Sequence, residues 1–412
     1  MIETIYPKAH PFEWPDGLLQ LARRPRRRPF DPAAVAFVHA LSSDILRSGA
    51  ARRYPELAAL AHWFRHAGRD AIERRVGNFV AGLRVRPRGL VFIVAPSNVE
   101  VLFIYGWLLS MLAGNGSIVR LSQKPSEVRD AFIEIVDKNG SGHPSLEDSW
   151  LVTYPHDDAV TAKISAACDA RIVWGGDATI AQLRAISLNP LAVEAGFADR
   201  FSFAAFAADR ICADSDERLS ELARRFVNDT LWFSQLACSS PRAVVWVGDE
   251  AAVDAARRRF WPLYLAAAAA FENEPAAVVS RVADLFMLAG AGAIEQLGAS
   301  LSAFPGRAMG RGSFAKVREL HSGHGLFVEY IVGTAADIIP LLEGKDQTLV
   351  VYGLGLEQIE TLIGQLPNRA LDRIVSPGQA TDFSIVWDGS DLFDILTRKV
   401  EIPPPPRASA SS

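Results

Sequence analysis

Cysteine is scarce in this chain of 412 residues: Cys168, Cys212 and Cys238 are the only three, and they lie far apart in the sequence. An odd number of widely spaced cysteines gives neither a disulfide framework nor the paired spacing of a metal site, so we expect a reducing environment and no bound metal. The N-terminus shows no basic segment followed by an apolar stretch and a cleavage site, so we expect no secretory signal and a cytoplasmic protein.

The chain also has no large excess of positive or negative charge. Lys and Arg number 43 and Asp and Glu 47, which gives a formal net charge of −4. This balance argues against a dedicated nucleic-acid-binding protein. The one strongly basic run, from Arg23 to Arg28, contains Pro25, and we expect it to be a solvated surface arm.

Residues 90–114 form the one apolar stretch that is long enough to span a bilayer. Pro96, Asn98 and Glu100 interrupt it, and such residues near the middle of a membrane helix would be costly. We therefore expect a buried strand followed by a buried helix, and no membrane span.

The complete glycine fingerprint of a dinucleotide-binding turn is also absent. Gly290-Ala-Gly292 lies within a run of helical spacing, and Gly353-Leu-Gly355 has no third glycine. A nicotinamide cofactor would have to bind through a different motif.

The apolar pattern that is present predicts an α/β protein with two domains. Helical spacing from about residue 30 to 85 gives way to alternating strands and helices, which is typical of an open, doubly wound, mostly parallel sheet. We expect a helical N-terminal region at 1–85, a first α/β domain at 86–209, a second α/β domain at 210–375, a return segment at 376–402 and a disordered tail at 403–412. The expected strands are 91–95, 117–121, 151–154, 171–174 and 201–207, then 243–247, 326–332 and 348–352, with long helical runs at 251–270 and 276–301.

Cys238 lies where a polar, turn-rich segment ends and a β-branched strand begins. Ser239, Ser240 and Pro241 follow it, and these residues break a helix and favour an exposed bend. A nucleophile suits such a bend. The alternative is a small buried core residue, as free cysteines often are.

Ligands of open α/β sheets bind at the carboxyl ends of the strands, so three strand-to-helix turns are candidates for a binding site. In Pro96-Ser97-Asn98 the amide of Asn98 can donate into a cleft or cap the next helix. Arg120 and Lys124, at and just past another strand end, are within reach of a ribose or phosphate and are equally suited to a solvated surface role.

The third turn is Gly175-Gly176, between a strand and a helix. Two glycines there let a phosphate approach the backbone N–H groups at the start of the helix. Asp177 can instead serve as the N-cap of that helix, and its charge does not favour a phosphate.

Six phrases, taken in order, resemble the aldehyde dehydrogenase superfamily, and most closely its acyl-CoA reductase branch, the type that supplies aldehyde in bacterial bioluminescence. They are Val94-Ala-Pro-Ser-Asn-Val99, Leu112-Ala-Gly-Asn115, Ile118-Val-Arg-Leu-Ser122, Val173-Trp-Gly-Gly-Asp177, Ala237-Cys-Ser-Ser-Pro241 and Val386-Trp-Asp-Gly389. The resemblance covers roughly residues 30 to 400. It implies that the first α/β domain binds a dinucleotide and that the second is catalytic.

The resemblance implies that Cys238 attacks the thioester of a fatty acyl-CoA, and that hydride from NADPH or NADH reduces the acyl-enzyme to the aldehyde. A thiolate is both a good nucleophile and a good leaving group, so one residue serves both half-reactions. Asn98 and the backbone N–H of Cys238 would form the oxyanion hole. The residues implied in cofactor binding are Pro96, Ser97, Arg120, Lys124, Gly175, Gly176, Thr179 and Gln347.

Some residues depart from the family pattern. Gln235 is separated from Cys238 by two residues rather than one, and Glu100 and Arg120 replace a proline and a lysine. Glu194 corresponds loosely to the glutamate general base, which serves hydrolytic release and is not needed in a reductase. His324, between two glycines, is the histidine to test as a partner of the thiol, with a surface role as the alternative.

The function expected is an acyl-CoA reductase, with NADPH favoured over NADH by Arg120 and Lys124. One alternative is an aldehyde dehydrogenase that works oxidatively with water or CoA as acceptor. The other is an acyl-carrying subunit of a fatty acid reductase complex, which needs an acyl-protein synthetase as partner. The resemblance also implies a homo-oligomer.

Overall fold

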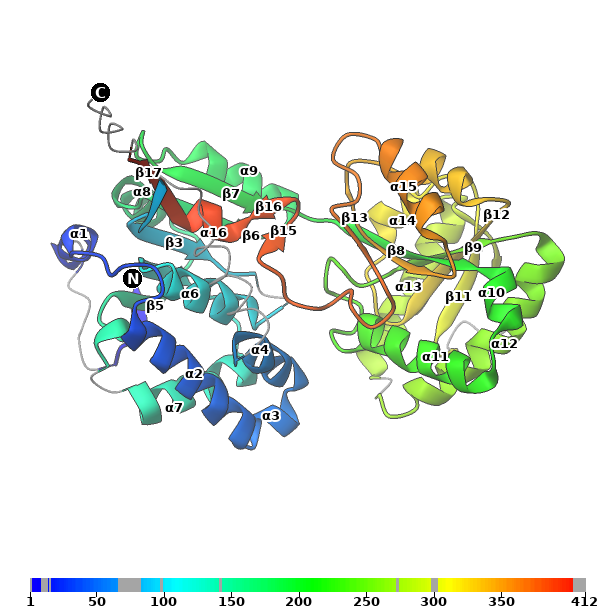
Figure 1. The fold of residues 1–412 in the computed structure, drawn as a ribbon, viewed down its shortest axis with the longest axis horizontal. Coiled ribbons are helices and arrows are strands. Elements are labelled where there is room, and N and C mark those ends of the chain that lie inside the picture. Colours follow the sequence, from blue (N-terminus) through cyan, green and yellow to red (C-terminus); the bar gives the residue numbers. More distant parts are fainter. Residues whose placement is uncertain are drawn as a thin grey trace, which may run out of the picture. The chain divides into compact units, whose positions relative to one another are not determined.

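The computed structural model of the chain describes residues 2–8, 14, 16–65, 83–96, 99–140, 143–271, 274–297 and 303–402. The chain forms two compact units: unit 1 consists of residues 1–198 and 383–412, and unit 2 of residues 199–382 (Figure 1). Unit 2 is thus inserted between two parts of unit 1.

Unit 1 contains a six-stranded sheet with the order β1-β5-β4-β3-β6-β7. The central strand β3 pairs in parallel with β4 on one side and with β6 on the other, and only the pair of β1 with β5 is antiparallel. The predicted doubly wound, mostly parallel sheet is confirmed. Its strands are β1 Glu3–Tyr6, β3 Leu90–Val94, β4 Gly116–Arg120, β5 Ser149–Thr153, β6 Ala170–Trp174 and β7 Val193–Phe197.

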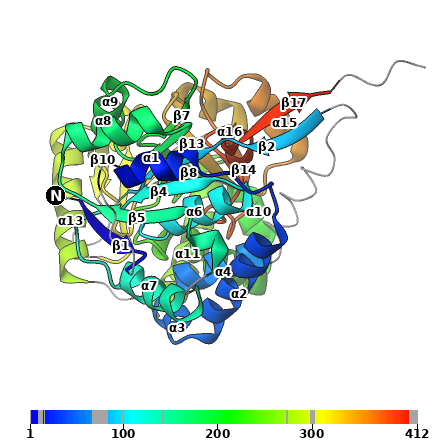
Figure 2. The same ribbon diagram turned by 90° about the vertical axis from the view of Figure 1, so that its left-hand side faces the viewer.

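Helices cover both faces of this sheet, with α8 and α9 on one side and α6 and α7 on the other (Figure 2). The bounds are α6 Leu102–Leu112, α7 Glu127–Gly140, α8 Asp158–Ala167 and α9 Asp177–Ala185. Every residue of β3 and of α6 is buried, so the buried strand and the buried helix predicted for this apolar stretch are confirmed. Within the described residues, no helix has the length and apolarity needed to cross a bilayer. Cys168 lies in the core beside β3, and burial raises its pKa to about 12.

The helical N-terminal region is part of unit 1 rather than a separate body. Its helices are α1 Asp16–Arg23, α2 Pro32–Arg47, α3 Ala50–Arg53 and α4 Pro55–Arg65. The Asp31 side chain accepts the N–H of Ala33 and Pro32 occupies the first turn, so α2 begins there. Its apolar face packs on α4, α6 and α7, because an amphipathic helix needs a partner for that face.

The last described residues return to unit 1. Strand β17 Thr397–Glu401 pairs antiparallel with β2 Leu83–Pro87. Before it come β15 Val386–Trp387, β16 Ser390–Asp391 and α16 Leu392–Leu396. The Tyr105 hydroxyl donates a hydrogen bond to the Ser384 carbonyl at 2.5 Å and its ring stacks on Phe383, which attaches this segment to α6. The predicted tail, 403–412, lies outside the described residues.

Unit 2 contains a seven-stranded sheet with the order β10-β11-β12-β9-β8-β13-β14, parallel except for the pair of β10 with β11. The strands are β8 Phe201–Ala207, β9 Ala243–Val247, β10 Ile294–Leu297, β11 Gly306–Gly310, β12 Leu326–Val332, β13 Asp346–Tyr352 and β14 Arg373–Val375. The helices of unit 2 are α10 Ala208–Ala213, α11 Asp216–Leu231, α12 Glu250–Ala268, α13 Pro275–Gly290, α14 Ala315–Leu320 and α15 Leu356–Gly364. Short 3-10 helices lie at Pro144–Leu146 in unit 1 and at Ala335–Leu341 in unit 2.

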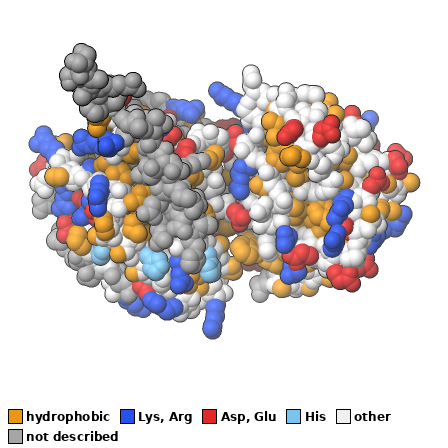
Figure 3. All heavy atoms as spheres, viewed as in Figure 1, with side chains coloured by type: hydrophobic (Ala, Val, Ile, Leu, Met, Phe, Trp, Pro, Cys, Tyr) orange, Lys and Arg blue, Asp and Glu red, His pale blue; other side chains and the backbone are white. Residues whose placement is uncertain are grey.

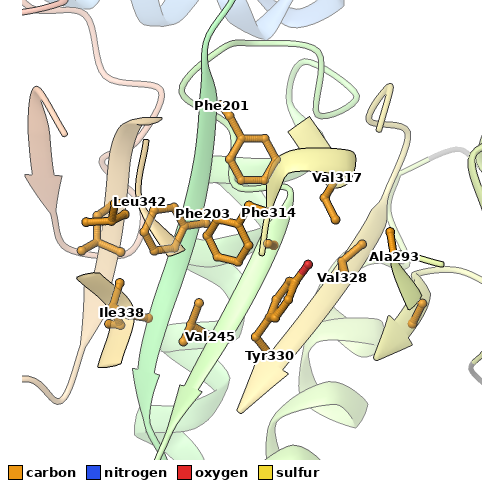
Figure 4. Packing of buried hydrophobic residues seen from close by; sticks show 14 of the residues in the cluster. Phe201, Phe203, Val245, Ala293, Phe314, Val317, Val328, Tyr330, Ile338 and Leu342 are labelled. Atoms are coloured by element: carbon orange, nitrogen blue, oxygen red, sulfur yellow. The ribbon is translucent and has the colours of Figure 1, made fainter. Parts of the chain in front are cut away.

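Alternate residues of β8 serve the two cores on either face of this sheet, as strand geometry requires. Phe203 packs in one core with Phe314 and Tyr330 (Figure 4), and Phe206 packs in the other with Trp246. Both faces are therefore covered by apolar layers. Basic and acidic side chains are interspersed on the visible face of each unit (Figure 3), in keeping with the net charge of −4.

Two expectations about elements were wrong. Residues 201–207, expected in the first sheet, form β8 of the second sheet, because an apolar run shows burial but does not show which sheet buries it. The fifth parallel strand of unit 1 is instead β7, whose Glu194 and Gly196 weaken its apolar pattern. The helix expected at 276–301 ends at Gly290, and the positive φ of Gly292 turns the chain into β10.

The cores of unit 2 give a test of the packing. Replacing Phe203 by Ala removes a fully buried ring whose centroid lies 5.1 Å from that of the Phe314 ring. The substitution should lower the free energy of unfolding by about 3–5 kcal/mol. The matched control is Phe286→Ala, because that ring is 61% exposed and its removal should cost less than about 0.5 kcal/mol. Urea unfolding curves of both variants test this, and equal losses would contradict the assigned core.

Candidate active site

Cys238 lies in the loop that enters β9, at the amino edge of the second sheet. Its side chain is partly exposed, unlike that of the buried Cys168. The hydroxyl of Ser202, at the start of β8, donates to the carbonyl of Cys238 at 2.7 Å and accepts the N–H of Thr348, on β13, at 3.2 Å. The nucleophile predicted from sequence is therefore fixed by its backbone to two neighbouring strands.

Gln235 gives this loop its shape. Its side chain is fully buried and donates to the carbonyls of Pro241 and Leu326 at 2.7 and 2.8 Å. The amide oxygen accepts the N–H groups of Gly325 and Leu326 at 3.0 and 3.1 Å. These bonds use both donors and both lone pairs of the amide. They hold Ser234 and Gln235 at φ of 49° and 61°, a conformation that few side chains adopt.

Two histidines precede β12 at the same edge of the sheet. His321 is buried; its Nδ1 accepts the N–H of Gly323 at 3.1 Å, so its Nε2 donates to the carbonyl of Leu326 at 3.0 Å. Burial lowers the pKa of His321 to about 3, and burial also lowers the pKa of His324. His324, chosen from the sequence, donates its backbone N–H to Ser234 at 2.8 Å. Both imidazoles are neutral at neutral pH, and His321 was not identified from the sequence.

Arg242 and Arg373 are two cations whose charges interact with Cys238. Burial lowers the pKa of each guanidinium, and the electrostatic attraction of Cys238 is among the effects that oppose it. Arg242 also donates to the carbonyl of His321 at 3.2 Å. Neither arginine was identified from the sequence, because nothing in their local patterns indicates that they meet the thiol.

A cavity of about 400 Å³ lies at the carboxyl ends of β3, β4, β5 and β6 in unit 1. This is the edge at which an open α/β sheet binds ligands. Six of the eight cofactor residues predicted from the sequence line it: Pro96, Arg120, Lys124, Gly175, Gly176 and Thr179. Ser97 and Asn98 lie outside the described residues, and Gln347 lies in unit 2, buried at the start of β13.

The cavity presents both cations and backbone groups. The Arg120 guanidinium lies 4.5 Å from the centroid of the Tyr154 ring, which holds it at the cavity wall. Gly176 is the N-cap of α9 and Asp177 its first helical residue, so the predicted N-cap alternative for Asp177 was wrong. A Cβ on Gly175 would lie 3.1 Å from the side chain of Thr179, whereas one on Gly176 would meet nothing. The wall at Gly176 is therefore open to a ligand.

Glu194 lies on β7 of unit 1, where two arginines hold its carboxylate. Arg171, which is buried, donates from Nε to Oε2 at 2.6 Å, and Arg184 donates from Nε to Oε1 at 3.3 Å. Both oxygens are engaged, as in a structural counter-ion of a buried guanidinium. The general-base role expected of Glu194 has no support in this geometry. Among the described residues, no group of three or more His, Cys, Asp or Glu side chains is arranged to hold a metal ion.

Comparison with known proteins gives a family match over part of the chain. Residues 82–260 match the model of the family described as acyl-CoA reductase (LuxC). A search of the curated proteins gave no match. The matched segment includes the cavity of unit 1 and the Cys238 loop.

Solved structures share the fold of nearly the whole chain at low identity. Succinic semialdehyde dehydrogenase from Streptococcus pyogenes, solved with NADP+, is 12% identical, with a TM-score of 0.70 and coverage of 94% of each chain. An oxidoreductase from Marinobacter aquaeolei is 12% identical, with a TM-score of 0.70 and coverage of 94% of this chain and 90% of its own. An NAD-dependent aldehyde dehydrogenase from Sinorhizobium meliloti is 15% identical, with a TM-score of 0.66 and coverage of 95% and 88%.

The chain thus has the aldehyde dehydrogenase fold with two α/β domains, and over residues 82–260 it carries the sequence pattern of the acyl-CoA reductases. These findings confirm the expected resemblance to the acyl-CoA reductase branch of the aldehyde dehydrogenase superfamily, and with it the class of oxidoreductases.

Proposed function

We propose that the chain is an acyl-CoA reductase, which converts a long-chain fatty acyl-CoA to the fatty aldehyde with NADPH through a thioester on Cys238. The observation that carries this proposal is the extent of the family match, which includes both the cavity of unit 1 and the Cys238 loop. The partial exposure of Cys238, set against the burial of Cys168, also supports it.

The proposed reaction begins with attack of the Cys238 thiolate on the thioester carbonyl. The new carbon–sulfur bond replaces the bond to CoA, which leaves as a thiolate and takes up a proton. A reduced nicotinamide bound in the unit 1 cavity would supply hydride for reduction of the acyl group. Cys238 then leaves the resulting hemithioacetal as a thiolate, which releases the aldehyde. The backbone N–H of Cys238, together with Asn98, is proposed to stabilise the oxyanion.

The residues of the unit 1 cavity fit the phosphate and ribose part of a nicotinamide dinucleotide. Arg120 and Lys124 supply positive charge at the cavity wall, and the N-terminus of α9 at Gly176 offers backbone N–H groups to a phosphate. Two cations on one wall favour the extra phosphate of NADPH over NADH. Gln347, which would contact the nicotinamide ribose, remains a proposal from the family resemblance.

Glu194 bears on the alternative of an oxidative dehydrogenase. Hydrolytic release of an acid needs a free carboxylate to activate water, and both oxygens of Glu194 accept from arginines. Reduction needs no such base, so this arrangement favours the reductase. The homo-oligomer and the acyl-activating partner protein are proposals that rest on the resemblance.

Replacement of Cys238 by Ala should abolish both acylation and reduction, because the proposed reaction carries the acyl chain on this thiol. Intact mass spectrometry after incubation with acyl-CoAs of different lengths measures the first, and aldehyde formation with NADPH the second. The matched control is Cys212→Ala, since that exposed thiol should be dispensable. An acyl adduct that survives in Cys238→Ala would refute the nucleophile.

The same assay distinguishes the alternative functions. Acyl-CoA with NADPH should turn over faster than aldehyde with NADP+, whereas the reverse order would indicate an oxidative dehydrogenase. Reduction of acyl-CoA by the purified chain alone would exclude an obligatory acyl-activating partner.

Replacement of Lys124 by Ala should weaken NADPH binding about tenfold or more, because a hydrogen bond to a charged group contributes about 1.5–3 kcal/mol. The effect on NADH should be smaller if Lys124 contacts the 2′-phosphate. Fluorescence titration with both cofactors measures this. Lys138→Ala removes an exposed lysine of unit 1 and serves as the control. Unchanged affinity for both cofactors in Lys124→Ala would contradict the assigned cavity.

A further inference from the structure

Helix α13 has two charged residues, Arg281 and Asp284, and both are buried. Its exposed positions carry apolar side chains instead: Val279 is 69% exposed and Phe286 is 61% exposed. A surface helix ordinarily turns its charged face to solvent and its apolar face to the core. Because a buried charge is costly unless it is paired or hydrogen-bonded, the inward charges of α13 need partners in unit 2.

These partners lie in residues 321–325, which lead into β12 and which we call the β12 entry loop. The Arg281 guanidinium donates from Nη1 to the carbonyl of His324 at 2.7 Å. One carboxylate oxygen of Asp284 accepts both the N–H and the hydroxyl of Ser322, each at 2.7 Å. Residues three apart on a helix lie on the same face, so α13 holds the loop at two points with charge-assisted hydrogen bonds, which are the strong ones.

The path of the Arg281 side chain to this loop depends on a glycine. Gly306 begins β11, and a Cβ there would lie 2.6 Å from Cδ and 3.1 Å from Cγ of Arg281. The guanidinium carbon lies 5.4 Å from the centroid of the Phe304 ring, and that ring would lie 2.7 Å from a Cβ on Gly325. The glycine at position 306 therefore leaves open the path by which Arg281 reaches the β12 entry loop.

The β12 entry loop is in turn bonded to the loop of Cys238, residues 234–241, which we call the thiol loop. The N–H of His324 donates to the carbonyl of Ser234 at 2.8 Å, so this residue is bound by α13 at its carbonyl and by the thiol loop at its N–H. Gly323 has a φ of 108°, and a Cβ there would lie 2.9 Å from the carbonyl oxygen of Gln235. The backbones of the two loops are therefore in direct contact.

We propose that Arg281 and Asp284 are positioning residues, which set the position of the Cys238 thiol through the β12 entry loop. The inference deepens the proposed function and rests on its assignment of Cys238 as the nucleophile. Ser202 holds the thiol loop at Cys238, and α13 holds its beginning. Attack on a thioester requires the sulfur close to the carbonyl carbon, and a displaced nucleophile lowers the rate of reaction without weakening substrate binding.

The test compares the geometry of Cys238 with its intrinsic reactivity in the full chain. Acylation by acyl-CoA at increasing concentration, followed at the Cys238 peptide by mass spectrometry, gives a maximal rate and a half-saturating concentration. Arg281→Met should lower the maximal rate about tenfold or more and leave the half-saturating concentration within about twofold. Alkylation of the same thiol by iodoacetamide, a small reagent with no fixed binding geometry, should change less than about threefold, because it follows the thiolate fraction.

Two conservative variants grade the effect. Asp284→Asn should lower the maximal rate of acylation by a smaller factor than Arg281→Met, because the amide retains one acceptor oxygen for Ser322. Arg281→Lys retains a charged donor and should recover part of the rate lost in Arg281→Met.

Two matched substitutions control for a general loss of stability. Arg259→Met removes an arginine that also donates to backbone carbonyls, those of Ile211 and Cys212 at 2.8 and 2.7 Å. Asp337→Asn removes a carboxylate that also accepts the N–H and the hydroxyl of one residue, Thr334, each at 2.8 Å. Both controls lie beyond the carboxyl ends of their strands, at the edge opposite to the thiol loop, and should acylate at the wild-type rate.

A second route tests the same contact if Arg281→Met does not fold. Gly306→Ala displaces the Arg281 side chain without removing its charge and should lower the maximal rate of acylation in the same way. An unchanged maximal rate in these variants, or an equal loss in Arg259→Met, would overturn the positioning role. A change confined to the half-saturating concentration would also overturn it, because that result assigns Arg281 to substrate binding.

Hydrogen exchange of the thiol loop needs neither acyl-CoA nor cofactor, so it decides the inference separately from the proposed function. Peptides covering residues 234–241 should exchange faster in Arg281→Met than in Arg259→Met, because local opening of the loop becomes easier. Equal exchange would contradict the coupling between α13 and this loop. A wild-type protein that forms no acyl adduct would refute the proposed function, and the exchange comparison would still decide whether α13 positions the loop.

Discussion

The buried side chain of Gln235 is the interaction on which the arrangement around Cys238 depends. A single amide forms four hydrogen bonds to backbone groups of two segments, the thiol loop and the entry to β12. Each bond satisfies a peptide group of a buried residue. The unusual backbone of residues 234 and 235 is tolerated because this network over-determines it. Cys238, the proposed nucleophile, therefore occupies a rigid position in a loop rather than a flexible one.

The electrostatics of the site follow from its rigidity and burial. Histidines in a dry region lose their charge, whereas arginines keep theirs at any physiological pH. The carbonyls of Gln379, Ala380 and Asp382 accept hydrogen bonds from the Arg373 guanidinium, which lets this cation remain partly buried.

Much of the fold could be predicted from the sequence. Strands β9 and β12 have the bounds expected of them, because a parallel strand covered on both faces must be a continuous apolar run. The cavity of unit 1 was predictable for a similar reason: the carboxyl ends of parallel strands converge, so residues such as Pro96, Arg120 and Gly176 meet there. The surroundings of Cys238 were not. They form at the amino edge of the second sheet from segments far apart in the sequence, such as Gln235 and the entry to β12, and no local pattern records which segments meet there.

The pairing of β2 with β17 has a consequence for how the chain is made. Residues 83–87 find their partner only at residues 397–401, while all strands of unit 2 come from the continuous segment 199–382. Synthesis proceeds from the N-terminus, and contacts between distant segments form late. The inserted unit can fold as soon as its own residues have left the ribosome, whereas unit 1, which begins first, is completed only after residues 397–401 have been synthesised.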